Sequence, residues 1–189
     1  MYNDIFQYSF PSVGAGSPFN FLVSNGIPNV RGVLVVPFLP KASNGKEDGA
    51  GNYSGVSTSS LYSPFSASGG APDPISFTNF NIQVSGKNLF INNLLYDYEN
   101  FAEQLVSSNQ LNGSLTTGLT SGLIGYYEWE NLFRYYYGNV SRSLPSEDGV
   151  AKAIQITGTN QSSKVIDIMV FVEFEREITI DVRTGARIQ

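Results

Sequence analysis

Apolar side chains recur at every second position in several short stretches of the chain. The first two of these rows are Phe6, Tyr8 and Phe10, and then Phe19, Phe21 and Val23. A period of two places successive apolar side chains on one face of a β-strand. The pattern therefore predicts two half-buried strands, which end at a turn marked by Pro28 and Asn29.

Later stretches extend the series of predicted strands. The run Val30 to Phe38 is apolar on both faces, which is typical of a central strand covered on both sides. Segments 75–84 and 87–95 flank Ser85 and Gly86, a pair that favours a hairpin turn. Further strands are expected at 140–144, 150–159 and 165–182.

Two segments change to a helical period. In 96–108, Asp97 can cap a helix of about three turns whose buried face carries Phe101 and Leu105. In 125–138, aromatic residues recur at helical spacing from Tyr126 through Trp129 to Tyr136 or Tyr137. Glu130 and Arg134 form an i, i+4 pair there, and Gly138 is expected to end the helix.

Residues 41–74 are rich in Gly, Ser, Asn and Pro and carry almost no apolar periodicity. We interpret them as one long loop and not as a linker, because the strands before it are too few to form a core alone. About eight strands, with one short helix in each of two long connections, predict an all-β fold. The chain is expected to be a single antiparallel jelly-roll sandwich spanning 1–189.

The segment from Val165 to Gly185 raises the question of catalytic carboxylates. Its even positions from Ile166 onward are apolar, whereas Glu173, Glu175 and Glu177 lie on the odd row. Neighbours in that row are roughly 7 Å apart along a strand, a spacing that could suit an inverting glycosidase. However, a row of polar neighbours gives neither acid the burial that would raise its pKa. We therefore expect a solvent-facing row that blocks strand aggregation.

Arg176 interrupts the apolar row. Either a bulge turns its side chain outward, or the residue is buried and paired with an acid. A bulge is favoured, because an unbroken strand from Val165 to Val182 would be roughly 60 Å long.

The composition excludes much of enzyme chemistry. The chain has no Cys and no His, so it can form neither a thiolate nucleophile nor a His-based triad or zinc site. No motif predicts a cofactor, and the acidic segments GKEDGAGN and PSEDG are expected to be solvated turns instead of Ca²⁺ sites. We accordingly expect a protein that is not an enzyme.

Charge and hydropathy narrow the range of partners. The net charge is −5 and there is no run of Lys or Arg, so direct nucleic-acid binding is not expected. The chain contains no stretch of eighteen apolar residues, so no membrane span is predicted. The first ten residues do not resemble a signal peptide. Sequons at Asn52, Asn112, Asn139 and Asn160 are mostly expected by chance in an Asn- and Ser-rich chain.

The aromatic cluster around Trp129 admits two interpretations. It could stack on a sugar or a base, but helical spacing favours packing against the sheet. So many aromatic residues also suit a buried subunit interface.

Several segments in order resemble the jelly-roll domains of viral major capsid proteins, most of all the double jelly-roll lineage of tailless DNA viruses and phages. These segments are FNFLVSNGIPNVRGVLVVPFLP, PISFTNFNIQVSGKNLFINNLLYDYENFAEQL, LTSGLIGYYEWENLFRYYYGNVSR and IQITGTNQSSKVIDIMVFVEFEREITIDVRTG. The chain has roughly half the length expected of two stacked jelly rolls. The matching residues Trp129, Arg134, Tyr135, Tyr136 and Arg142 would be framework or intersubunit contacts.

The resemblance implies a structural capsid protein that assembles with itself and with other capsid proteins in the virion, without catalysis. The alternative from the residues is a carbohydrate-binding jelly roll, such as a lectin or a fibre adhesin. A carboxylate glycosidase is the third hypothesis.

Overall fold

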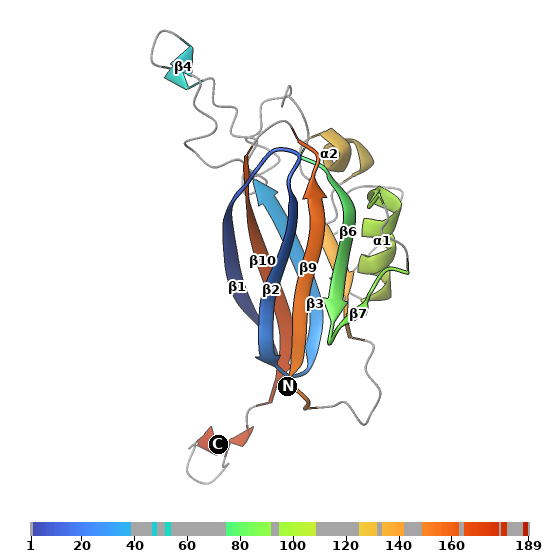
Figure 1. Cartoon of the computed structure of the whole chain (residues 1–189). Coiled ribbons are helices and arrows are strands. Elements are labelled where there is room, and N and C mark those ends of the chain that lie inside the picture. The colour runs from blue at the N-terminus through green and yellow to red at the C-terminus, as the bar shows by residue number, and fades with distance from the viewer. Residues whose placement is uncertain are drawn as a thin grey trace.

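The computed structural model is a β-sandwich with two helices on one flank (Figure 1). The structure describes residues 2–38, 47–48, 52–53, 75–91, 95–108, 125–131, 134–141, 149–162, 165–177, 179–180 and 187–188. The strands of the sandwich are β1 (Tyr2–Val13), β2 (Pro18–Ile27), β3 (Val30–Phe38), β6 (Phe77–Val84), β7 (Lys87–Asn88), β8 (Tyr136–Asn139), β9 (Lys152–Asn160) and β10 (Ile166–Arg176). Two short pairs lie outside it, β4 (Glu47–Asp48) with β5 (Asn52–Tyr53) and β11 (Thr179–Ile180) with β12 (Arg187–Ile188).

The strand order is that of a jelly roll. The first sheet runs β1-β10-β3-β8 and the second runs β2-β9-β6-β7. The first strand of the sandwich therefore pairs with the last, the second with the next to last, and so on inward to the β6–β7 hairpin, all antiparallel. Folding such a nested series of hairpins into two sheets gives the jelly-roll topology. The predicted all-β antiparallel sandwich is confirmed.

The core lies between the inward rows of the two sheets. On β10 the burial alternates from Ile166 to Phe174, with the even positions inside. Residues of the second sheet, such as Phe77, Phe80 and Ile156, meet this row and are fully buried. The period-two rows at the start of the chain are also confirmed, since they form β1 and β2. The run at Val30 forms β3, which lies between β10 and β8 as a central strand.

The hairpin predicted at Ser85 and Gly86 is present. Both residues have positive φ, 50° and 79°, and they connect β6 to β7 with Val84 opposite Lys87. A two-residue loop with positive φ at both positions matches the twist of the strands that it joins.

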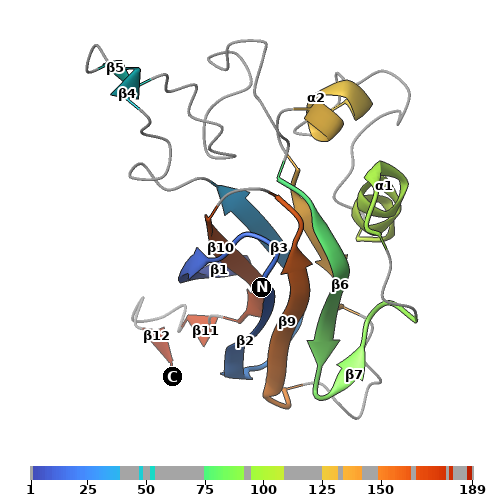
Figure 2. The same cartoon turned by 45° about the horizontal axis from the view of Figure 1, so that its top comes forward.

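Helix α1 (Tyr98–Ser107) begins where the sequence predicts. Its N-cap is Asp97, whose carboxylate accepts a hydrogen bond from the backbone N–H of Asn100 at 2.9 Å. Phe101 is buried and Leu105 packs against the core. The helix packs beside β8, and Figures 1 and 2 both show α1 and α2 on the flank opposite β1.

The second helix is shorter than its aromatic spacing predicts. Helix α2 (Tyr126–Asn131) ends before Arg134, and Tyr136 and Tyr137 belong to strand β8. Gly138 lies inside that strand and does not stop a helix. A Cβ atom at Gly138 would lie 2.5 Å from the Ile82 side chain, which explains the absence of a side chain there. The strand predicted at 140–144 does not include 140–141, and β8 occupies the four residues before them; residues 142–144 lie outside the described part of the chain.

The prediction of a bulge at Arg176 is wrong. Arg176 is paired with Tyr2 in regular register and is the last residue of β10, at an end of the sandwich where the inner row reaches solvent. Its exposed guanidinium donates to Asp4 of β1 at 2.9 Å and lies over the ring of Phe174. Because β10 ends here, no overlong strand forms. The bulge lies on the neighbouring strand β3, at Arg31.

Candidate functional site

A polar hollow of about 410 Å³ opens on the outer face of the first sheet, beside the C-terminal end of α1. Its walls come from strands β1, β3, β8 and β10 and from the last turn of α1. The lining residues are Asn3, Arg31, Ser107, Ser108, Tyr137, Asn139, Ser141 and Glu175. Every one of them carries a polar side chain.

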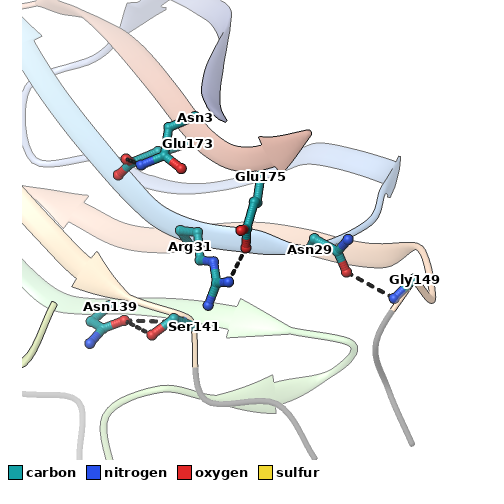
Figure 3. A network of polar contacts seen from close by, with 8 residues as sticks. All are labelled: Asn3, Asn29, Arg31, Asn139, Ser141, Gly149, Glu173 and Glu175. Carbon is teal, nitrogen blue, oxygen red and sulfur yellow. Dashed lines mark hydrogen bonds and ion pairs between the residues drawn. The ribbon is translucent and has the colours of Figure 1, made fainter. Parts of the chain in front are cut away.

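A β-bulge positions the charged pair of the hollow. Glu173 of β10 lies opposite Gly32, but Phe174 lies opposite Val30, so Arg31 is an extra residue in β3. The Arg31 guanidinium forms an ion pair with Glu175 (Figure 3). The turn before Arg31 is held by Asn29, whose carbonyl accepts from the N–H of Glu175 at 3.0 Å. The side-chain oxygen of Asn29 accepts a second hydrogen bond, from the backbone N–H of Gly149 at 2.8 Å.

Helix α1 forms the opposite wall by covering the free edge of β8. The Gln104 side chain accepts from the backbone N–H of Asn139 at 3.0 Å, where a further strand would otherwise pair. The Asn139 amide donates to the Ser107 hydroxyl at 3.0 Å, and Ser107 donates to the carbonyl of Gln104 at 2.8 Å. These contacts fix the end of the helix against the sheet.

The floor of the hollow depends on Gly32. Tyr137 and Gly32 are diagonal neighbours on β8 and β3, and a Cβ atom at Gly32 would lie 2.3 Å from the Tyr137 hydroxyl oxygen. Tyr137 is 4% exposed, and burial raises the pKa of its hydroxyl. The nearby carboxylate of Glu173 raises this pKa further, and a hydrogen bond with the Ser108 side chain lowers it.

The glutamates of β10 lie on the outer face, as their parity predicts. Glu173 accepts from the side-chain amide of Asn3 at 2.7 Å, and Glu175 pairs with Arg31, whereas Glu177 is exposed beyond the strand. Both acids in the sheet therefore face hydrogen-bond donors on the outer surface. Neither has the apolar surroundings that a glycosidase general acid requires.

The framework candidates Trp129, Arg134, Tyr135 and Tyr136 do not line this hollow, whereas Glu175, also considered from the sequence, does. Trp129 is 0% exposed, its indole N–H donates to the carbonyl of Tyr135, and the side chain of Arg134 lies over its ring. Tyr136 is also fully buried and accepts from the N–H of Phe77 at 2.9 Å. Trp129 and Tyr136 therefore pack in the core and cannot stack on a sugar, whereas Tyr126 and Tyr127 of the same cluster are exposed.

Two further framework candidates lie among the described residues. Arg134 pairs with Glu130 as the i, i+4 spacing indicates, and Tyr135 is half-buried. Arg142 lies outside the described residues. The first four residues of PSEDG and most of GKEDGAGN also lie outside them.

Two of the sequons have a structural use. The Asn139 and Asn160 side-chain oxygens each accept from the backbone N–H and the hydroxyl of the Ser two positions later. Both asparagines are buried, and their amide nitrogens are occupied as donors. Within the described ranges these two sequons end strands β8 and β9.

Comparison with family models, curated proteins and solved structures finds no match to this chain. In the part of the chain that the structure describes, no group of three metal-binding side chains gathers at one place. No helix among those residues has the length and apolar character needed to cross a membrane.

Proposed function

We propose that the protein is a structural capsid component that acts by self-association in the shell of a virus or phage particle. The jelly-roll strand order supports this proposal, together with the resemblance of its segments to viral capsid domains. Fold alone does not determine function, so the surfaces that the fold presents must also support this role.

The observation that carries the proposal is the set of exposed apolar side chains on the helix flank, meaning α1, α2 and the residue Leu95 before α1. Tyr126 and Tyr127 are 63% and 69% exposed, although α2 also carries the fully buried Trp129. Leu95 and Val106 are exposed on the same flank. Exposed aromatic and aliphatic side chains on one flank are typical of protein–protein interfaces.

The opposite flank carries a second set. Strand β1 is the edge of the first sheet farthest from β8, and its Tyr2, Ile5 and Phe6 are exposed. A sandwich with apolar side chains on both flanks can contact a neighbour on each side, which an extended shell requires. The net charge of −5 favours a shell layer that does not contact the nucleic acid directly.

Light scattering coupled to size exclusion, over a wide range of protein concentration, tests the proposal. We expect concentration-dependent oligomers, and negative-stain images of concentrated samples should show arrays or particles. The double variant Tyr126→Ser/Tyr127→Ser should weaken association about tenfold or more, because interface aromatics are frequent hot spots. Leu22→Ser, which removes an exposed apolar side chain from β2, is the matched control and should assemble normally.

A strictly monomeric wild-type protein at every concentration, with no ordered assemblies in the images, would overturn the proposal. Oligomers that persist unchanged in the double variant would move the interface away from the helix flank.

A further inference from the structure

The polar hollow is not needed for self-association through the flanks, and its lining gives it a ligand preference of its own. Most small-molecule sites are largely apolar with a few polar groups. Here every lining residue is polar, from Asn3 on β1 to Ser141 after β8. An apolar ligand would remove these groups from water without replacing their hydrogen bonds.

The charges of the hollow disfavour an ionic ligand. Arg31 and Glu175 neutralise one another, and Figure 3 shows Arg31 between Glu175 and the Asn139–Ser141 pair. An anion placed beside Arg31 would also face Glu175, with Glu173 on the same face of β10. A cation placed beside Glu175 would face the Arg31 guanidinium. A neutral ligand avoids both repulsions.

The hollow carries hydrogen-bond donors and hydrogen-bond acceptors side by side. Arg31 has five N–H donors and gives one to Glu175, while each carboxylate oxygen of Glu175 can accept more than one bond. Asn3 and Asn139 each donate one bond through an amide that has two hydrogens. The Tyr137 hydroxyl at the floor bonds the Ser108 side chain, and because a hydroxyl both donates and accepts, it can hold a second partner.

We propose that the hollow binds a neutral, hydroxyl-rich ligand, namely a sugar residue of a glycan. Each sugar hydroxyl both donates and accepts, which matches a lining of mixed donors and acceptors. The volume of about 410 Å³ lies within the range of small-molecule sites. The site differs from the aromatic cluster first considered for sugar binding, because Trp129 and Tyr136 at the centre of that cluster are buried. Tyr137, the aromatic residue of the described lining, is only 4% exposed and offers little surface for stacking, so binding is weak and depends on the hydrogen bonds.

Saturation-transfer NMR on the full chain provides the test. The probes are the methyl glycosides of glucose, galactose, mannose and N-acetylglucosamine, with arginine methyl ester and glucuronic acid as a cationic and an anionic comparator. We expect transfer to at least one neutral glycoside at millimolar concentration, and none to the two charged compounds at the same concentration.

Variants then place the binding in the hollow. Tyr137→Phe removes only the hydroxyl at the floor and should reduce binding about tenfold, the loss expected for one hydrogen bond in a polar site. Tyr126→Phe is its matched control on α2 and should bind as wild type. Gly32→Ala drives a methyl group into the Tyr137 hydroxyl and should abolish binding, whereas Gly26→Ala, which meets nothing within 4 Å, should not.

The Tyr137→Phe variant keeps the test valid if Gly32→Ala does not fold, because it removes only the hydroxyl oxygen and adds no bulk. Absence of transfer to every neutral glycoside would overturn the inference. So would preferred binding of a charged comparator, or binding that Tyr137→Phe leaves unchanged. None of these outcomes bears on self-association, which is measured separately.

Discussion

Asn160 shows how one side chain can end a strand and join it to a neighbouring turn. Its amide nitrogen donates to the carbonyls of Val13 and Gly14 at 3.3 and 3.0 Å, while its oxygen accepts from Ser162. The side chain is fully buried. Asn139 repeats the arrangement toward Ser141 at the end of β8. Asn-X-Ser at these places is therefore a strand-ending motif, in which the asparagine closes a local turn.

Asn160→Asp should destabilise the protein by about 2–4 kcal/mol, because it replaces a donor facing two carbonyls with a buried carboxylate oxygen. Urea unfolding at neutral pH measures the change. Asn20→Asp is the control, since Asn20 is exposed on β2 and uses only its oxygen, as acceptor from Gln155. Equal stability of the two variants would show that the Asn160 amide contributes nothing.

At the scale of elements, alternation predicted the strands well because each sheet has one buried face. The rows of β1, β2 and β10 could be assigned by parity alone. The same reasoning failed at Tyr136, because Trp129 and Tyr136 are both buried in one core, one from a helix and one from a strand. Seven residues apart, they also fit a helical period, so spacing alone could not distinguish the two arrangements.

The hollow was not predictable from the sequence for a related reason. It needs the extra residue Arg31 in β3, the missing side chain at Gly32 and the placement of α1 against β8. Each of these depends on contacts between segments distant in the sequence, from 35 residues apart for Gln104 and Asn139 to 144 residues apart for Arg31 and Glu175. The only signal in the sequence was Glu175 on the outward row of its strand.

The position of α1 depends on its N-cap. Asp97→Ala removes the acceptor for the N–H of Asn100 and should lower the free energy of unfolding by about 1 kcal/mol. Asp97→Ser, which keeps an acceptor oxygen, should recover most of the loss. Thermal unfolding followed by circular dichroism measures both changes. If alanine and serine are equivalent at this position, the cap does not stabilise the helix.

At the scale of the whole molecule, a group of tyrosines joins the two sheets to the helices. Tyr136 of the first sheet stacks on Phe77 of the second at 4.6 Å and accepts from its backbone N–H. Tyr96, just before α1, donates to the carbonyl of Tyr137 at 2.6 Å and accepts from its N–H at 3.0 Å. Burial raises the pKa of all three of these tyrosines. The folded state therefore favours the protonated form of all three hydroxyls.

This linkage predicts a loss of stability at alkaline pH. In the unfolded chain a tyrosine releases its proton near pH 10, whereas the folded protein holds the protons of Tyr96, Tyr136 and Tyr137 to higher pH. The unfolded state then binds fewer protons, so the free energy of unfolding falls as pH rises above about 10. A tyrosine that keeps its proton in the folded protein through this range contributes up to about 1.4 kcal/mol per pH unit, and none of this loss occurs below that range.

Urea unfolding at pH values on both sides of about 10 measures the slope. Tyr136→Phe should be less stable near neutral pH, because the Phe77 N–H loses its acceptor. Its free energy of unfolding should fall less steeply with pH in the alkaline range, because up to one proton fewer is linked to folding. Tyr126→Phe, on the exposed side of α2, should keep the wild-type slope. Parallel slopes for Tyr136→Phe and the wild type would show that this phenol ionises equally in both states. Burial between the sheets would then not be what holds its proton.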